Sequence, residues 1–272
     1  MTKVMSLIIA VENIKDLNET YKFGFDELNY LYIEQASVAG FSVDEEVKAK
    51  DLLYGLVLPS GADAAYGIAR LAAGSQEAFV ELMNEKCDEL GLKNTHFCNP
   101  SGLHDENQYT TPAEMALIMK YAMSNEECAK VLGTYQYTTE ATPQHPHGIS
   151  LTSTMFSRMY GNEVEGVTIK AGKTGYTSNA LSTLITLADN GNMKLVCVVL
   201  RTHGVNIYPD TKNLFEYAFN NFQKIQVADE KKPDEVEKFI SAADSQSAVS
   251  AQSDGSEDTE SVQTGGNEYQ PL

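Results

Sequence analysis

The sequence predicts an α+β fold, in which an antiparallel sheet carries flanking helices and a mostly helical subdomain is inserted ahead of the sheet. Three observations predict it. Apolar residues recur at helical spacing through the first half of the chain. Short β-rich runs separated by Gly and Asn turns then follow at 167–170, 181–188 and 194–201. A closing segment, 209–225, is amphipathic, with Leu214, Tyr217, Ala218 and Phe222 on its predicted buried face.

The first predicted helix covers 1–14 and begins without a cap or a preceding turn. Its basic start and apolar run also resemble a signal peptide. However, Glu12 and Asn13 follow the apolar run at once and no small-x-small cleavage site is present, so we favour an ordinary buried helix. A globular domain seldom begins on such a helix, which indicates that the domain is truncated at its start.

Local start signals define most of the other predicted helices. Ser42 with Glu45 three residues later has the spacing of a capping box, and Thr111 followed by Pro112 is typical of a helix start. The predicted helices cover 43–58, 62–73, 76–90, 112–124 and 126–132, and predicted loops cover 18–40 and 94–109.

Two local signals describe the end of the chain: a predicted turn and a polar segment of low apolar content. Asp189-Asn190-Gly191-Asn192, between the last two β-rich runs, predicts a hairpin turn. The segment 228–272 is rich in Ser, Asp, Glu, Gln and Gly and has too few large apolar residues to offset chain entropy, which predicts disorder. We therefore expect one domain over 1–227 and an acidic Ser-rich tail over 228–272.

Composition excludes some classes of protein. The 272-residue chain has a formal net charge of -18, whereas a nucleic-acid binder needs a basic face. The four cysteines are widely spaced and form no C-x-x-C pair, which argues against a structural zinc site and a disulfide framework. We expect mostly buried thiols and leave one Cys–Cys pair open. No apolar run approaches the roughly 20 residues that span a bilayer.

The sharpest chemical motif is Lys173-Thr174-Gly175, between two predicted strands. An ammonium and a hydroxyl at the edge of a sheet can hold a carboxylate, and the glycine lets a substrate backbone approach the strand closely. Alone the tripeptide is weak, because it also occurs by chance as a plain turn. Its value depends on partner motifs upstream.

Penicillin-recognising enzymes carry Ser-x-x-Lys, Ser-x-Asn and Lys-Thr-Gly in that chain order. Ser60-Gly61-Ala62 looks like the second element, with Ala62 in place of asparagine. The stretch Met1-Thr2-Lys3-Val4-Met5 looks like the first, with the serine expected immediately before Met1.

The segment 94–111 also resembles the loop between the second and third motifs of one such family. From Met1 to about Phe222, the chain resembles the serine-type D-Ala-D-Ala carboxypeptidases, which are penicillin-binding proteins of peptidase family S11. This resemblance implies the β-lactamase/penicillin-binding transpeptidase-like fold without its first strands.

The resemblance also implies a mechanism. A serine and a lysine one helical turn apart share a face, so the amine of Lys3 would take the proton of the serine expected before Met1. Ser60 would relay the proton to the leaving D-alanine. Lys173 and Thr174 would hold the substrate carboxylate, and backbone N–H groups near Tyr176 would stabilise the oxyanion. Gly175 and Ala62 would complete the substrate-binding set, and no metal or organic cofactor is implied.

The implied partners are peptidoglycan stem peptides that end in D-Ala-D-Ala, with β-lactam antibiotics as inhibitors and no nucleic acid. The implied location is outside the cytoplasmic membrane, on the cell envelope. This chain carries no export signal, so we expect membrane association only through segments that are not present. Without the serine, we expect the chain as it stands to be inactive.

Two alternatives stay open. Ala62 in place of asparagine, together with the missing serine, also suits a catalytically silent peptidoglycan-binding or regulatory homologue. A serine β-lactamase would share the three motifs, but it would need a deacylating glutamate ahead of Lys-Thr-Gly and usually an Asp within the second motif. Gly61 and the segment 94–111 favour the carboxypeptidase.

His145 and His147 lack an accompanying acidic cluster and are interpreted as part of a solvated loop rather than a metal site.

Overall fold

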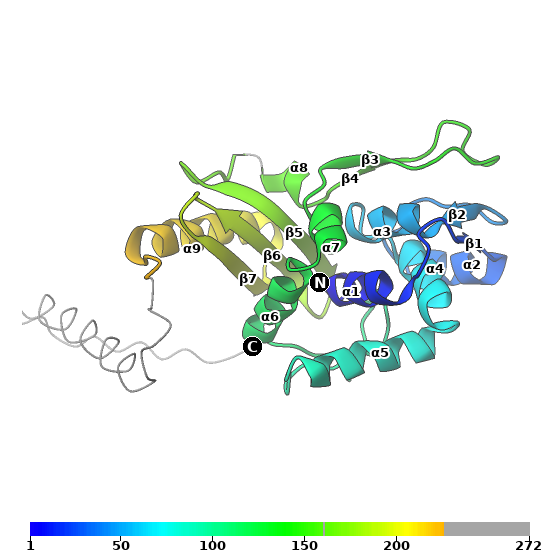
Figure 1. Cartoon of the computed structure of the whole chain (residues 1–272), viewed down its shortest axis with the longest axis horizontal. Helices are drawn as coiled ribbons and strands as arrows, with labels where there is room; N and C mark the ends of the chain where they lie inside the picture. Colours follow the sequence, from blue (N-terminus) through cyan, green and yellow to red (C-terminus); the bar gives the residue numbers. More distant parts are fainter. Residues whose placement is uncertain (160, 226–272) are drawn as a thin grey trace, which may run out of the picture. The chain divides into compact units, whose positions relative to one another are not determined.

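The computed structural model describes residues 1–159 and 161–225, and residues Met1–Lys224 form one compact unit (Figure 1). Its largest sheet has three antiparallel strands in the order β5 (Thr168–Thr177), β6 (Leu181–Asp189) and β7 (Lys194–Thr202). The predicted hairpin turn is confirmed, since Asp189 pairs with Lys194 across it. The α+β class is confirmed as well.

Both faces of this sheet are covered. Successive side chains of a strand point to opposite faces. Ile185 and Leu187 on β6 accordingly join the main hydrophobic core, whereas Leu184 joins a smaller cluster with Ile207 and Tyr208 at the start of α9 (Ile207–Asn221). Burial from both sides explains why residues 184–188 of β6 are all buried.

The main core is centred on helix α1 (Lys3–Asn13). Every residue from Lys3 to Ala10 is buried, so this part of the helix has no solvent-facing side. The helices packed around it are α3 (Ala49–Val57), α4 (Ala62–Ala73), α5 (Gln76–Glu89), α6 (Pro112–Ala122) and α7 (Glu126–Leu132). The start of α1 therefore lies deep in the protein, where polar groups need partners.

The helix start predicted at Thr111-Pro112 is confirmed, and two further helices carry side-chain caps that were not predicted. The Thr111 hydroxyl accepts the N–H of Glu114 ahead of α6, and the Ser75 hydroxyl accepts the N–H of Ala78 ahead of α5. The Asn125 side chain caps α7 in the same way.

The predicted helix over 43–58 is wrong in its first half. The Ser42 N–H does donate to the Glu45 carboxylate at 2.7 Å, as in a capping box. However, Asp44 has a left-handed backbone (φ +62°), and strand β2 (Glu46–Lys48) follows and pairs with β1 (Thr20–Lys22). The helix begins only at Ala49, because the extended pairing with β1 takes the backbone of the preceding residues.

The loop predicted over 18–40 is also wrong, because it contains β1 and helix α2 (Phe25–Ile33). Leu31 is the one residue of α2 that is fully buried, and Phe25, Tyr32 and Ile33 are exposed. With so little of the helix facing the core, its apolar residues do not mark one face, and helical spacing could not reveal it.

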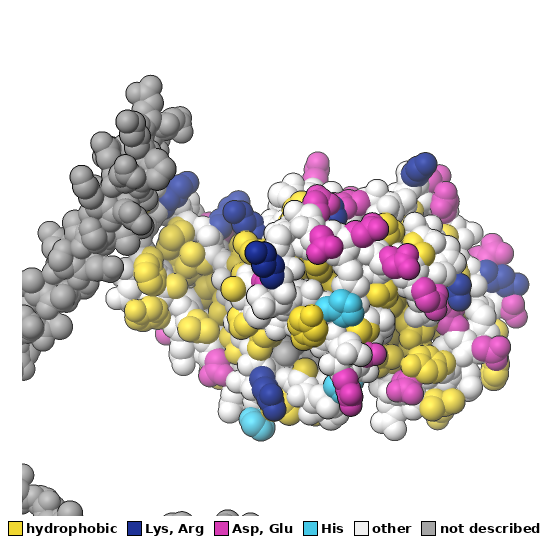
Figure 2. Space-filling model, turned by 90° about the horizontal axis from the view of Figure 1, so that it is seen from below, with side chains coloured by type: hydrophobic (Ala, Val, Ile, Leu, Met, Phe, Trp, Pro, Cys, Tyr) yellow, Lys and Arg dark blue, Asp and Glu magenta, His cyan; other side chains and the backbone are white. Residues whose placement is uncertain are grey.

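Helix α9 buries a different face from the one predicted. Its buried residues are Ile207, Tyr208, Thr211 and Phe215, while Leu214, Tyr217 and Phe222 are 49%, 61% and 60% exposed. The helix starts two residues before Pro209, and Ile207 and Tyr208 fix which side meets the sheet. Figure 2 shows apolar side chains gathered at the surface of the end of this unit that carries α9.

A long hairpin connects the helical subdomain to the sheet. Strands β3 (Gln136–Thr138) and β4 (Ser150–Thr152) pair antiparallel, and the short helix α8 (Phe156–Met159) follows them. Strand β5 extends further than the β-rich run 167–170 that predicted it, and it runs through the Lys-Thr-Gly motif to Thr177. A single turn of 3-10 helix, η1 (Gly204–Asn206), precedes α9.

Some predictions concern residues whose structure is not described. The predicted acidic tail, 228–272, lies outside the described residues. All four cysteines lie within them and are free, with Cys87 and Cys128 buried. Among the described helices, none combines the length and the apolar character that crossing a bilayer requires.

Candidate active site

Lys3 occupies the first turn of α1 and is 8% exposed. Its ammonium donates a hydrogen bond to the backbone carbonyl of Ser101, far away in the sequence. A buried ammonium needs such an acceptor, because an unpaired buried charge is costly. Ser101 thus holds the amine of Lys3 at a fixed place in the core.

The loop 99–102 is held tightly against this helix start. The Ser6 hydroxyl donates to the carbonyl of Pro100 at 2.7 Å, and the Asn99 side chain accepts the N–H of Gly102 at 2.7 Å. Gly102 has a left-handed backbone (φ +79°), and a Cβ there would lie 3.1 Å from the side chain of Thr2. The loop therefore has little freedom to move away from Lys3.

Lys173 reaches the same region from strand β5. Its side chain is 1% exposed, and its ammonium donates to the carbonyl of Thr174 at 2.9 Å. Gly175, two residues further, shares its face of the strand. A Cβ on Gly175 would lie 2.8 Å from the backbone nitrogen of Met1 and 2.5 Å from the hydroxyl of Thr183. Only glycine leaves room for the chain at Met1 to pass this strand.

Two buried amines, those of Lys3 and Lys173, therefore share one site. Burial lowers the pKa of Lys3 from 10.5 to about 8, although the carboxylate of Asp63 acts in the opposite direction. Burial and the charge of Lys3 lower the pKa of Lys173 well below its ordinary value. The site favours the neutral, nucleophilic or basic forms of its amines.

Asp63, in the first turn of α4, is the acidic partner of this site. Its side chain is fully buried and accepts the backbone N–H groups of Ala39, Gly40 and Phe41. Burial raises the pKa of Asp63, while these N–H donors lower it. The carboxylate thus anchors the loop at 39–41 and partly offsets the loss of solvation of Lys3.

Ser60 and Ala62 lie in the turn between α3 and α4. Ser60 has a left-handed backbone (φ +67°), which is uncommon for a residue other than glycine and costs energy. A Cβ on Gly61 would lie 2.7 Å from the carbonyl of Gly55. Ala62 is 2% exposed and its N–H donates to the carbonyl of Ser37 at 2.7 Å. This turn is thus closely fitted around a strained serine.

The structure brings most of the predicted site residues together, but not all of them. Lys3 and Lys173 lie close enough for the charge of Lys3 to lower the pKa of Lys173, and Gly175 lies against Met1. Within the described residues, the Ser60 hydroxyl makes no hydrogen bond, so it does not contact Lys3 in this way. The Tyr176 side chain is 72% exposed to solvent, so only the backbone of Tyr176 is considered as part of the site.

Residues that sequence reasoning missed also shape the site. The Ser101 carbonyl accepts a hydrogen bond from Lys3, the charge of Asp63 raises the pKa of Lys3, and Thr154 bonds to Thr174. Ser101 lies within the segment 94–111 that carried the family resemblance, but nothing local predicted that its carbonyl would meet Lys3. Neither Asp63 nor Thr154 gave a signal in the sequence beyond its polarity.

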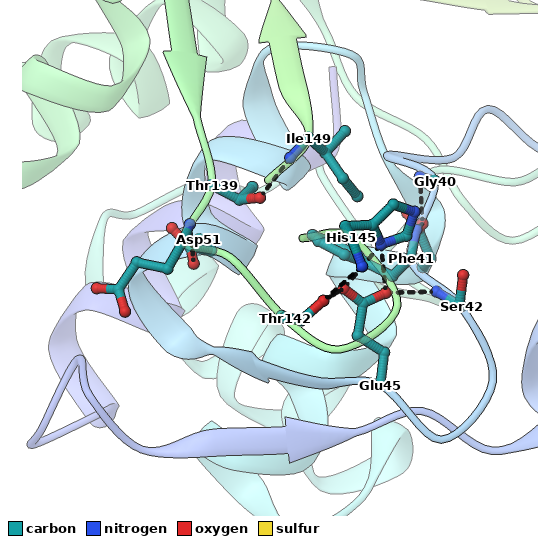
Figure 3. A network of polar contacts seen from close by, with 11 residues as sticks. Gly40, Phe41, Ser42, Glu45, Asp51, Thr139, Thr142, His145 and Ile149 are labelled. Carbon is teal, nitrogen blue, oxygen red and sulfur yellow. Dashed lines mark hydrogen bonds and ion pairs between the residues drawn. The ribbon is translucent and has the colours of Figure 1, made fainter. Parts of the chain in front are cut away.

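Of the two histidines set aside as metal ligands, His145 has a structural role, whereas His147 is exposed. His145 was expected in a solvated loop, but its Nδ1 lies 2.9 Å from the Glu45 carboxylate, which is 1% exposed (Figure 3). The same carboxylate accepts the hydroxyl of Thr142 at 2.6 Å. Among the described residues, no group of three or more His, Cys, Asp or Glu side chains could hold a metal ion. His145 instead fastens the β3–β4 hairpin to the helical subdomain.

Comparison with known proteins agrees with this geometry. The family model of the peptidase S11 D-alanyl-D-alanine carboxypeptidases matches residues 1–204. The chain is 34% identical over 204 residues to D-alanyl-D-alanine carboxypeptidase DacF of Bacillus subtilis, covering 73% of this chain and 49% of that protein. It is 32% identical over 186 residues to DacA of Escherichia coli strain K12, covering 66% and 42%.

The fold itself matches a solved structure. The Streptomyces K15 DD-transpeptidase superimposes with a TM-score of 0.71 at 26% identity, covering 80% of this chain and 86% of that one. The fold and the site thus define a penicillin-binding type of domain. More specifically, the chain belongs to the D-alanyl-D-alanine carboxypeptidase family, peptidase S11. It spans about half the length of the curated relatives it matches.

Proposed function

We propose that this chain is the catalytic domain of a serine-type D-Ala-D-Ala carboxypeptidase that acts on peptidoglycan stem peptides. The residue immediately before Met1 is the proposed place of the nucleophilic serine. One observation carries this proposal: the backbone of Met1 lies at Gly175, in the field of the amines of Lys3 and Lys173. A serine attached there would lie three residues before Lys3, on the same face of the first helical turn.

The chemistry follows from the state of Lys3. A pKa of about 8 leaves about one Lys3 in ten neutral at pH 7, whereas an ordinary lysine is almost wholly charged. The neutral amine removes the serine proton as the oxygen attacks the carbonyl of the penultimate D-alanine. The terminal D-alanine leaves with a proton relayed through Ser60, and water then hydrolyses the acyl-enzyme.

The substrate-binding roles belong to β5. Lys173 and Thr174 are proposed to hold the terminal carboxylate of the substrate, and Gly175 allows its backbone to lie close to the strand. The backbone N–H of Tyr176 is proposed to join that of the nucleophilic serine in stabilising the oxyanion. The position of Ala62, buried beside Ser60, supports a role in lining the site rather than in hydrogen bonding.

A labelling experiment tests the nucleophile. Three proteins are compared: the chain as it stands, the chain preceded by a serine, and the chain preceded by an alanine. We expect a fluorescent penicillin to label the serine form covalently and the other two not at all. Labelling of the alanine form would contradict the proposal, and no labelling of a folded serine form would favour a catalytically silent peptidoglycan-binding homologue.

A second measurement separates carboxypeptidase from β-lactamase. The serine form is expected to release D-alanine from a peptide ending in D-Ala-D-Ala and to hold the penicilloyl group for long times, so β-lactams act as inhibitors. Rapid turnover of penicillin without release of D-alanine would indicate the β-lactamase instead. The same family resemblance supports a location on the cell envelope for the whole protein.

A further inference from the structure

We propose that Thr154, on the segment between β4 and α8, is a positioning residue that sets the direction of the Thr174 hydroxyl. This inference rests on the proposed function, because it gives that hydroxyl a carboxylate to bind. The Thr154 and Thr174 hydroxyl oxygens lie 2.7 Å apart, a normal hydrogen bond. Thr154 thereby selects ligands that end in a free carboxylate.

The direction of this hydrogen bond follows from counting protons. A threonine hydroxyl has one proton to donate and two lone pairs that accept. To bind a carboxylate, Thr174 must donate its proton to the ligand. It can therefore only accept from Thr154, and Thr154 must donate. Because the Thr154 hydroxyl donates its hydrogen bond to the Thr174 oxygen, the Thr174 hydroxyl can direct its own proton away from Thr154, toward the carboxylate.

Thr154 can do this because its own backbone is fixed. Its N–H donates to the carbonyl of Leu58 at 3.0 Å, immediately ahead of the turn that carries Ser60. The preceding residue, Ser153, is buried, and its N–H donates to the carbonyl of Tyr135 at 2.8 Å. Thr154 and its neighbour Ser153 thus connect β5, the Ser60 turn and the hairpin, and the Thr154 hydroxyl is held where these three parts join.

The hairpin ahead of Thr154 is in turn fastened to the helical subdomain. The buried Asp51 carboxylate accepts the Tyr137 hydroxyl at 2.6 Å and the N–H of Glu140 at 3.1 Å. The buried Glu45 carboxylate accepts the Thr142 hydroxyl and contacts His145 (Figure 3). Two buried carboxylates therefore keep the hairpin in place, and the position of Thr154 does not depend on its contact with Thr174.

A purely structural role is the alternative, in which the contact only holds β5 in place. The two roles differ in what the hydroxyl does, so a substitution of equal shape separates them. Thr154→Val keeps the volume and the backbone hydrogen bonds but cannot donate, while Thr154→Ser keeps the donor. Thr152→Val, two residues before Thr154, is the matched control, because among the described residues the Thr152 hydroxyl accepts one hydrogen bond, from the exposed Gln136 side chain at 3.3 Å.

The first measurement is ligand preference, made on the chain as it stands so that no acylation intervenes. Dissociation constants are determined by NMR titration for a peptide ending in D-Ala-D-Ala and for the same peptide with a C-terminal amide. We expect Thr154→Val to weaken binding of the free acid about tenfold to a hundredfold, the effect of losing one aligned hydrogen bond to a charged group, and to leave the amide within about twofold. Thr154→Ser and Thr152→Val should both resemble the parent.

The second measurement needs no ligand. Scalar couplings of the Thr174 side chain report its χ1 rotamer, and we expect one rotamer in the parent and in Thr154→Ser, but several in Thr154→Val. An unchanged acid-to-amide ratio with a single Thr174 rotamer in Thr154→Val would overturn the proposal. If the parent binds neither peptide, the proposed function fails, and the rotamers of Thr174 still decide whether Thr154 positions it.

Discussion

Lys3 and Lys173, one on the first turn of a helix and one on a strand, place two buried amines in the same site. Burial and the charge of Lys3 together lower the pKa of Lys173 well below its ordinary value. Neither lysine makes an ion pair in the described part of the chain, and each donates instead to a backbone carbonyl. Such an arrangement costs stability and is typical of a site kept for chemistry.

Lys3→Met is expected to stabilise the fold at pH 7. The pKa of Lys3 is about 8 in the folded protein and 10.5 when the side chain is solvated, so protonation favours the unfolded chain. The penalty is fully present below pH 8, fades as pH rises from 8 to 10.5, and is absent above that range. We expect Lys3→Met to raise the free energy of unfolding by about 1–3 kcal/mol at pH 7, because the lost contact to Ser101 offsets part of the gain.

Urea denaturation at pH 7 and at pH 10.5 measures this difference. Lys130→Met is the control, since Lys130 is exposed and makes only a surface ion pair with Glu127 at 3.5 Å. It should change stability by less than about 0.5 kcal/mol at either pH. A Lys3→Met protein that is less stable than its parent at pH 7, or whose free energy of unfolding rises equally at both pH values, would contradict the conclusion that burial destabilises the charged form of Lys3.

Asp63→Asn is expected to lower the pKa of Lys3 further, below about 8. The Asp63 carboxylate raises the pKa of Lys3, so its removal leaves burial unopposed. Titration of the Lys3 side chain by NMR measures the pKa directly. In the form with a serine before Met1, the rise of the acylation rate with pH should shift to lower pH by the same amount.

Asp26→Asn, on the exposed start of α2, is the control and should leave the Lys3 titration unchanged. Asp63 also holds the loop at 39–41, so the unfolding free energy of Asp63→Asn must be measured alongside. A Lys3 pKa that stays at or above 8 in a folded Asp63→Asn protein would show that the two groups are not coupled.

Glu45→Ala is expected to destabilise the protein by about 1–3 kcal/mol. The substitution leaves the Ser42 N–H, the Thr142 hydroxyl and His145 without their buried acceptor (Figure 3). Hydrogen exchange should also increase in the hairpin, because Glu45 is one of its two anchors. Glu46→Ala, at the neighbouring exposed residue, is the matched control, and we expect it to change the free energy of unfolding little. Equal effects of the two substitutions would exclude a role for Glu45 in holding the hairpin.

The sequence by itself determined the elements whose signals are local. The helix that begins after Thr111 and the hairpin at 189–192 each follow from a few adjacent residues, whereas the extension of β5 through Lys173-Thr174-Gly175 appears only in the structure. Local signals work there because caps, turns and strand pleats are made by near neighbours. The order of the three motifs was likewise readable, and with it the family.

Only the tertiary structure decided which distant groups meet. The Ser101 carbonyl is the partner of Lys3, Thr154 is the partner of Thr174, and Asp63 acts on Lys3 from another helix. No spacing in the chain encodes such pairs, because they depend on how the helices and the sheet pack. For the same reason, packing decided which face of α9 is buried: apolar periodicity gives candidate faces, and contact with the rest of the core selects one of them. Packing also decided that the Glu45 carboxylate accepts the Thr142 hydroxyl.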